Sequence, residues 1–318
     1  MLSRFALAVV LATCAWAAGE EEDASLGALL RGSFDLARAR SPEMQYYRME
    51  TDVIAYAPDG SQAGVDTYTL LLSCVPAGQS GKAADEYTCE RLTMRLSGGP
   101  EVSIPALEGW TYPFVGDSDV VLGIAHAKFE ALTDSEGAAL PPDKAYLVYN
   151  SFIDFHGFCN AFAEPTAGGR GIQDLTEIGQ RIVHAAAFTE PSVELGSNVG
   201  EGSHYRNGEV TLALKGLSAI DGVPCAMVGF DSGQSSFQMF LEPMPGMRIT
   251  AVGGSHYMGD LYIDLETMLV RRATMAEFVV SQVQMPEPQG AINGVTERAL
   301  VIEALSAEEF ERERGVAP

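Results

Sequence analysis

Residues 45–76 read QYYRMETDVIAYAPDGSQAGVDTYTLLLSCVP, and Pro58-Asp59-Gly60 separates two runs that are rich in Val, Thr, Tyr and Leu. β-branched and aromatic residues favour strands, whereas Pro, Asp and Gly in succession favour a tight turn. We therefore predict an antiparallel hairpin with strands near 45–57 and 65–76. The same texture fills most of the chain, so the fold is predicted to be mainly β.

Further turn signals occur downstream at Ser97-Gly98-Gly99-Pro100 and at Asp221-Gly222. Gly and Pro at such places end one strand and let the chain reverse into the next. The remaining strands are predicted near 86–97, 145–156, 208–216, 223–231, 235–242, 247–252, 257–265, 268–285 and 293–304. This arrangement indicates a series of antiparallel hairpins.

Two segments carry apolar residues at helical spacing instead. The first spans residues 24–40 and is ended by Pro42, which cannot continue a helix. The second spans residues 174–187, where Asp174 and Glu177 have the spacing of a capping box. We predict a helix in each segment.

A third, short and charged helix is predicted after Ser306, because Ser306 and Glu309 also have capping-box spacing. The best linker candidate, residues 164–171, separates a region 24–163 from a region 174–312. Each region begins with a helix and continues as hairpins. We therefore predict an α+β fold, mainly β, with helices covering a curved antiparallel sheet or half-barrel. The two regions can be separate domains or one continuous domain.

The first residues have the features of a secretory signal. Arg4 precedes an apolar stretch over residues 5–15, and Ala15-Trp16-Ala17 has the form of a cleavage site. We predict that residues 1–17 are a signal peptide and that the protein is extracytoplasmic, either periplasmic or secreted. Alternatively, residues 11–14 form a lipobox that leaves a lipid anchor on Cys14. The mature chain is expected to have no transmembrane segment, because it lacks a run of about 20 apolar residues.

The chain is strongly acidic, with a formal net charge of -23 at pH 7. Nucleic acid and anionic membrane surfaces are themselves negative and would repel such a protein. Neither is therefore an expected partner. The acidity either serves solubility or provides an acidic face for cationic ligands or Ca²⁺.

Four cysteines remain after processing, and an even number in an oxidising compartment favours disulfides. Cys74 ends one apolar run and Cys89 begins the next, as in a bridged hairpin. We predict a Cys74–Cys89 disulfide and, by elimination, a Cys159–Cys225 disulfide. Their spacing supports neither a redox motif nor a metal site.

A short repeat is the strongest candidate for a metal site. Gly202-Ser203-His204-Tyr205 recurs as Gly254-Ser255-His256-Tyr257, and Glu209 and Asp260 follow the two copies. Zinc requires three or four such ligands at about 2 Å. The alternative, which we favour, is that each histidine bonds a backbone carbonyl where a turn leads into a strand. We therefore predict no metal and no cofactor.

Gly116-Asp117-Ser118 resembles the nucleophile block of GDS-type esterases. Those enzymes also need a late Asp-x-x-His element, which this chain lacks. A turn capped by Asp117 and Ser118 is the favoured interpretation. A serine or metal-dependent hydrolase remains the alternative function.

Three aromatic residues, Trp110, Tyr112 and Phe114, alternate along a short segment. Alternation places their side chains on one face of an extended chain. They can line the mouth of a ligand site or belong to an aromatic core.

A signal peptide, an N-terminal helix and long antiparallel strands make up an order that resembles the periplasmic lipoprotein-carrier superfamily. The resemblance covers residues 24–160 or 174–304 and includes no shared motif, so it assigns no site residues. It implies a half-open barrel that holds acyl chains. We expect a non-enzymatic exported protein whose partner is an apolar small molecule, a lipid or another protein of the cell envelope. The further alternative is a structural envelope protein with a solid core and no cleft.

Overall fold

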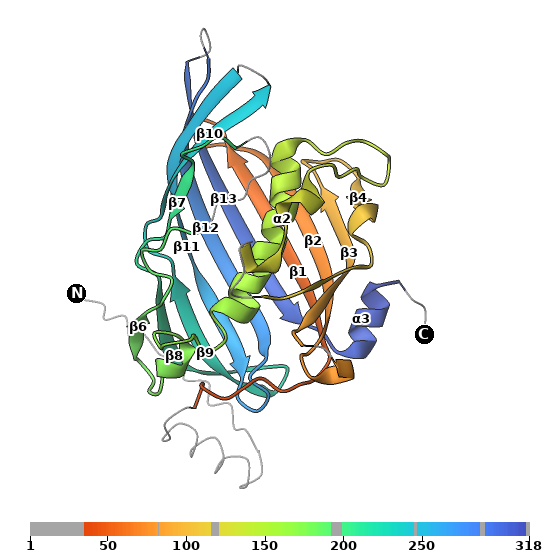
Figure 1. The fold of residues 1–318 in the computed structure, drawn as a ribbon, viewed down its shortest axis with the longest axis vertical. Coiled ribbons are helices and arrows are strands. Elements are labelled where there is room, and N and C mark those ends of the chain that lie inside the picture. Colours follow the sequence, from red (N-terminus) through yellow and green to blue (C-terminus); the bar gives the residue numbers. More distant parts are fainter. Residues whose placement is uncertain are drawn as a thin grey trace, which may run out of the picture. The chain divides into compact units, whose positions relative to one another are not determined.

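The computed structural model describes residues 35–81, 83–115, 121–191, 199–244, 247–286 and 290–315. Within these residues, thirteen strands form one large open antiparallel sheet (Figure 1). The strands are β1 (Gln45–Tyr56), β2 (Gln62–Val75), β3 (Glu86–Arg95), β4 (Glu101–Ser103), β5 (Trp110–Pro113), β6 (Arg181–Val183), β7 (His204–Arg206), β8 (Thr211–Ile220), β9 (Val223–Asp231), β10 (Ser236–Met244), β11 (Met247–Asp264), β12 (Val270–Gln284) and β13 (Ala291–Ala304). The predicted mainly β class is confirmed.

The described helices are few and short beside the sheet. They are α2 (Pro142–His156), the π-helical turn η5 (Gly157–Ala161), α3 (Ala307–Glu313) and the 3-10 turns η1 (Gln79–Gly81), η2 (Pro105–Leu107), η3 (Val121–Gly123), η4 (His126–Phe129) and η6 (Ile172–Asp174). No helix in this part of the chain is long and apolar enough to cross a membrane.

The sheet joins strands from the two ends of the chain. Its order is β4-β3-β2-β1-β13-β12-β11-β9-β8-β6, and β1 pairs with both β2 and β13. The region 24–163 and the region 174–312 therefore contribute to one continuous sheet. β11 is long enough to pair with β9 along one part and with β10 along another, and β7 adds to β10.

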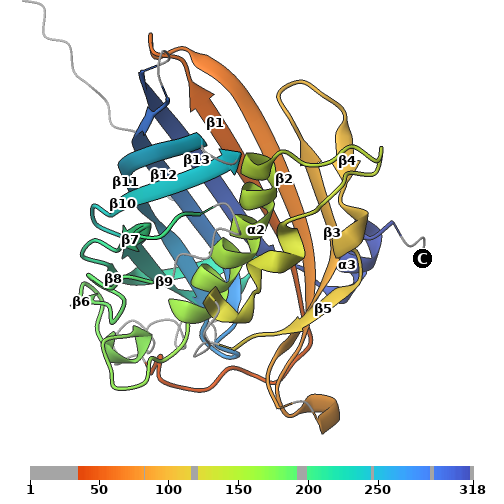
Figure 2. The same ribbon diagram turned by 45° about the horizontal axis from the view of Figure 1, so that its top comes forward.

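α2 lies against one face of this sheet, as both views show (Figures 1 and 2). Pro142 occupies its first turn, where a missing N–H costs nothing, and Asp143 complements the helix dipole. Val148, Phe152 and Phe155 are fully buried against the sheet. Their spacing of three and four residues is that of one helix face.

The strand predicted at 145–156 is therefore wrong. Its Tyr, Val, Ile and Phe content suits a strand, but the apolar positions follow the helical period and a Pro-Pro pair precedes them. The helix predicted at 174–187 is also wrong. That segment contains the end of η6 and then β6, which pairs with β8. Gly179 has a φ of +90°, which no helix accommodates.

The predictions for the two ends of the chain have different outcomes. The predicted signal peptide, Cys14 and residues 24–34 of the predicted first helix lie outside the described residues, and Asp35–Arg40 form a turn. The predicted C-terminal helix is confirmed as α3. Ser306 and Glu309 form the full capping box, in which the Ser306 hydroxyl accepts from the Glu309 amide.

The strands predicted at 247–252 and 257–265 are one strand, β11. Gly253 and Gly254 suggest a break in the sequence, but both lie inside the strand. A Cβ at Gly254 would lie 2.5 Å from the Ser235 carbonyl oxygen. Glycine is required there because two backbones approach closely, and the chain does not turn.

The predicted Cys74–Cys89 disulfide is wrong. Cys74 lies opposite Tyr87 in the β2–β3 register, whereas Cys89 lies opposite Leu72. The two cysteines are diagonal neighbours, which in a sheet are about 7–8 Å apart and beyond the usual Cα separation of a disulfide. An apolar hairpin thus resembles a bridged one in sequence but has the wrong register for a bridge.

The predicted Cys159–Cys225 disulfide is wrong as well. No two cysteines of the described chain lie at disulfide distance, and all four described thiols are free and buried. Burial raises the pKa of each thiol, that of Cys74 to about 12. These thiols therefore behave as small apolar side chains.

Candidate ligand cavity

A cavity of about 360 Å³ lies between α2 with η5 and the facing strands of the sheet. Its walls are largely apolar and include six aromatic and two methionine side chains. The helical side contributes Tyr146, Tyr149, Phe158 and Phe162, and the strands contribute Tyr205 from β7, Met239 from β10, Tyr257 from β11 and Met275 from β12. The remaining wall includes Leu122 from η3 and Pro191 from a loop.

Strand alternation explains why three polar residues face this cavity. Tyr257, Glu277 and Arg298 lie directly opposite one another across β11, β12 and β13. Opposite residues in an antiparallel sheet project from the same face. The row therefore points to the side of the sheet on which α2 lies.

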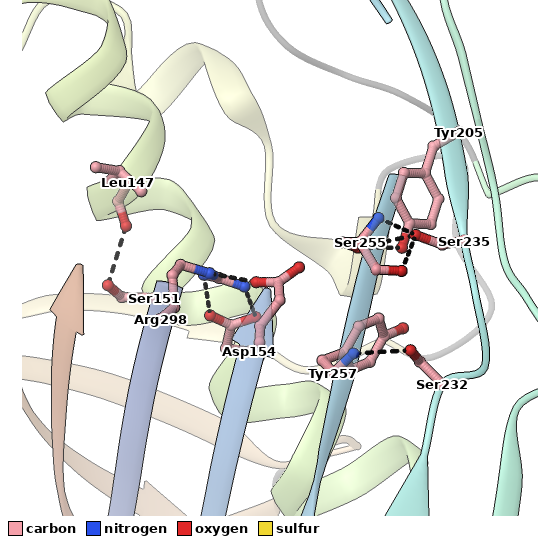
Figure 3. A network of polar contacts seen from close by, with 10 residues as sticks. Leu147, Ser151, Asp154, Tyr205, Ser232, Ser235, Ser255, Tyr257 and Arg298 are labelled. Atoms are coloured by element: carbon pink, nitrogen blue, oxygen red, sulfur yellow. Dashed lines mark hydrogen bonds and ion pairs between the residues drawn. The ribbon is translucent and has the colours of Figure 1, made fainter. Parts of the chain in front are cut away.

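Arg298 is the centre of a buried ion-pair cluster in the cavity wall (Figure 3). Its Nη1 donates to Asp154 Oδ2 at 2.7 Å, its Nη2 is 3.4 Å from Asp154 Oδ1, and its Nε donates to Glu277 Oε2. The exposed fractions of the three side chains are 11% for Arg298, 13% for Asp154 and 9% for Glu277. The cluster connects α2 to two strands of the sheet.

Burial and charge act in opposite directions on this cluster. Burial raises the pKa of Asp154, and the facing guanidinium of Arg298 reduces that rise. The two carboxylates raise the pKa of Arg298, so the guanidinium stays charged. Fully ionised, the cluster holds two negative charges and one positive charge.

A second network holds the wall formed by β7, β10 and β11 (Figure 3). The Ser235 and Ser255 hydroxyls are 2.8 Å apart, and the Ser255 amide donates to Ser235 Oγ at 3.1 Å. The Tyr205 hydroxyl lies 3.4 Å from Ser255 Oγ. The Tyr257 amide donates to Ser232 Oγ at 3.0 Å. These bonds hold the two tyrosines at the cavity wall.

The candidate metal ligands are not brought together. His204 lies exposed on β7 with Nδ1 3.2 Å from the Gly202 carbonyl oxygen, whereas His256 on β11 bonds Asp231 at 2.9 Å. Asp260 pairs with Lys215, and Glu209 is exposed. Residues 35–315, apart from the gaps given above, contain no group of three or more His, Cys, Asp or Glu side chains arranged to hold a metal.

The repeat nevertheless bears on the site through its tyrosines. Tyr205 and Tyr257 both line the cavity, while the preceding histidines do not. Neighbouring residues in a strand point to opposite faces, so a histidine directed outward places the next tyrosine inward. Alternation applied to the repeat would have identified the tyrosines.

The aromatic stripe lies beside α2 and not in the cavity wall. Trp110 and Tyr112 stack with ring centroids 4.5 Å apart, and Phe114 stacks on His156 at 4.9 Å. Tyr112 is nearly fully buried. Gly116, Asp117 and Ser118 lie outside the described residues.

The buried imidazole of His156 anchors the end of α2. Its Nε2 accepts from the Tyr112 hydroxyl and its Nδ1 donates to Asn160 Oδ1, both at 2.8 Å. Asn160 in turn donates to Glu164, which pairs with Arg40. Desolvation lowers the pKa of His156 to about 4, so the ring is neutral at pH 7. A neutral imidazole has one donor and one acceptor, and both are satisfied here.

No protein-family model and no curated protein matches the sequence. Among solved structures, the chain is similar to lipovitellin, described for its lipid–protein interactions, with 12% identity over 85% of this chain and 26% of that chain, and a TM-score of 0.28. It is also similar to OmpF of Salmonella typhi in complex with daunomycin, with 8% identity over 83% of this chain and 97% of that chain, and a TM-score of 0.20. The chain spans about a quarter of the lipovitellin chain. Likenesses at these TM-scores carry no argument about function.

Proposed function

We propose that this protein binds an amphipathic small molecule or lipid in the cavity between α2 and the sheet. The observation that carries the proposal is the cavity itself, whose largely apolar lining includes the ion-paired side chains of Asp154, Glu277 and Arg298. Its volume of about 360 Å³ falls in the range of about 300–1,000 Å³ that is usual for small-molecule sites. The structural alternative, which expects a solid core, does not account for it.

The walls suit an apolar ligand body. Phe158 and Phe162 come from η5 and its C-cap, Met239 from β10 and Met275 from β12, and methionine adapts its shape to varied apolar partners. Burying apolar surface contributes about 25 cal/mol per Å², so such walls supply the affinity. The Asp154, Glu277 and Arg298 cluster supplies orientation, because polar groups in an apolar site accept only a matching partner.

We also propose that binding takes place outside the cytoplasm, on the strength of the signal-like residues 1–17. Processing at Ala17 predicts a chain that begins at Ala18, which N-terminal sequencing of protein from an exporting host would reveal. A chain that keeps Arg4 would contradict export by this route. Lipid on Cys14 would support the anchored alternative.

Filling the cavity tests the binding proposal. Ala161 lines the cavity from η5, and Ala161→Phe places a bulky ring there without touching the ion-pair cluster. The probe is the neutral fluorophore N-phenyl-1-naphthylamine, which brightens in apolar sites. We expect the substitution to weaken probe binding by about tenfold or more, because overfilled apolar space excludes the ligand.

Ala299→Phe is the matched control. Ala299 is exposed and neighbours Arg298 on β13, so it points away from the cavity. We expect this variant to bind the probe as the unchanged protein does. Equal probe binding by the protein and by Ala161→Phe would overturn the proposed function. Native mass spectrometry of the protein from an exporting host would then identify any retained molecule that denaturation releases.

A further inference from the structure

The charged residues of the cavity lining carry more negative than positive charge. Asp154 and Glu277 provide two carboxylates, and Arg298 is the only cation among the described residues that line the cavity. Arg298 directs Nη1 and Nη2 to Asp154 and Nε to Glu277, so one guanidinium serves both acids. One negative charge is left without a partner.

Glu277 places this unpaired negative charge at the cavity wall. Its side chain is nine-tenths buried, and only Oε2 has a hydrogen-bond partner within the described structure. Oε1 accepts no bond there, although it is not sealed inside the protein, since Glu277 is part of the cavity wall. A carboxylate oxygen without a donor in a mostly apolar space is costly unless a ligand supplies the donor.

Two phenol rings extend the same preference. Tyr257 from β11 lies directly opposite Glu277 in the antiparallel register, and Tyr146 from α2 lines the same cavity. The faces of aromatic rings attract cations. The net charge of -23 adds a long-range attraction for cationic ligands.

We propose that the ligand carries a protonated amino group on an apolar body and that this group donates a hydrogen bond to Glu277 Oε1. This proposal rests on the proposed function. The amine makes the cluster neutral, with two positive and two negative charges, while the apolar body lies against the Phe and Met walls. A carboxylate ligand would instead add a third negative charge to the site.

A matched ligand series tests the selectivity on the unchanged protein. Octylamine, octanol and octanoate have the same chain length and differ in the charge of the head group at pH 7. We expect octylamine to displace N-phenyl-1-naphthylamine at a concentration about tenfold lower than octanol, because charge-assisted bonds are the stronger ones. Octanoate should require a higher concentration than octanol. Displacement by octanoate at or below the octylamine concentration would overturn the proposal.

Glu277→Gln removes the excess charge and keeps the shape of the side chain. We expect this variant to bind the probe while octylamine and octanol displace it within about threefold of each other. An unchanged preference for octylamine would assign the selectivity to another group and overturn the proposal. If this variant does not fold, the ligand series on the unchanged protein decides the matter by itself.

The two proposals fail in different ways. If Ala161→Phe leaves the affinity for the probe unchanged, the cavity is not the binding site and both proposals are wrong. Probe binding that is lost in Ala161→Phe but shows no preference for the amine leaves the cavity as a ligand site and removes only its cationic selectivity.

Discussion

Glu277 on β12 and Arg298 on β13 lie directly opposite each other in the antiparallel register, and the Arg298 Nε donates to the Glu277 carboxylate on the face covered by α2. Asp154 of α2 completes the cluster from the other side. A helix and two strands therefore depend on one guanidinium. The same guanidinium lines the cavity, so stability and binding are coupled at this point.

Replacing Arg298 by methionine leaves two buried carboxylates without a counter-ion. We expect Arg298→Met to destabilise the protein by about 3–5 kcal/mol at pH 7, because an uncompensated buried charge is costly. Urea unfolding measures this loss. Arg95→Met is the control, since Arg95 is exposed at the end of β3.

The same variant should respond to pH in a defined direction. Burial raises the folded-state pKa of Asp154, and losing the Arg298 guanidinium, which reduces that rise, raises it further above the unfolded value. A carboxyl whose pKa is raised in the folded state stabilises that state more as the pH falls, because the folded state binds the extra proton. The stability difference from the unchanged protein should therefore shrink between pH 7 and pH 5. A difference that grows over that range would show that the cluster does not hold the structure in this way.

His156 makes a separate contribution to the pH dependence of stability. Its folded-state pKa of about 4 lies below the unfolded value near 6.5, so only the unfolded state binds a proton between these values. Stability should fall as the pH drops through this window, by up to about 3 kcal/mol. Urea unfolding at several pH values measures the slope.

His156→Gln removes this titration. The difference in unfolding free energy between the protein and His156→Gln should narrow as the pH falls from 6.5 to 4. Glu164 acts in the opposite direction, because burial raises its pKa. Its contribution to the pH dependence, and the effects of Asp85 and Arg40 on this network, are present in both proteins and cancel in the difference. His256→Gln is the control, since that ring is partly exposed. Parallel curves for the protein and His156→Gln would contradict a neutral buried imidazole.

Much of the sheet was predictable from the sequence. Strand β9 (Val223–Asp231) matches its predicted bounds of 223–231 because Asp221-Gly222 fixes the turn before it, and most other strands agree within a few residues. α2 was missed because its residues also have high β-propensity. The spacing of its buried positions and the preceding Pro141-Pro142 pair distinguish the helix, which shows that period outweighs propensity for apolar segments of this length.

The cavity was less predictable. Glu277 and Arg298 are buried between apolar residues of the same strand face, Met275 on β12 and Leu300 on β13, and that alternation is visible in the sequence. Their pairing depends on the register of β12 and β13, which the sequence does not specify. Asp154 reaches them only from the helix α2, whereas the sequence predicts a strand at 145–156. The site therefore emerges only when the helix is placed on the sheet.

Ser235 connects the β10 segment to β11, so its removal should affect both stability and binding. Its hydroxyl contacts the amide, carbonyl and hydroxyl of Ser255 in a buried position. We expect Ser235→Ala to cost about 1–3 kcal/mol, the range for unsatisfied buried partners. Probe binding should weaken as well, because Met239 and Tyr205 lose their support. Ser97→Ala, at an exposed turn, is the control; equal effects of the two changes would contradict this role.

The four buried cysteines should be free but unreactive in the folded protein. Burial raises the pKa of every thiol, so little thiolate exists at pH 8 to attack a reagent. In a chain that begins at Ala18, we expect iodoacetamide to modify none of them in the folded state. In urea without a reductant it should modify all four. Intact mass spectrometry counts the additions.

The outcome in urea discriminates between free thiols and bridged pairs. Two additions would indicate one disulfide, and none would indicate two, as the sequence alone had predicted. Cys89→Ala offers a second measurement. Loss of a free buried thiol should cost only the packing of one small side chain, on the order of 1 kcal/mol, because no loop constraint is removed. A Cys74–Cys89 bridge predicts a different result: a loss of about 3 kcal/mol or more in Cys89→Ala, and an equal loss in the unchanged protein when a reductant is added. That result would contradict the register of β2 and β3.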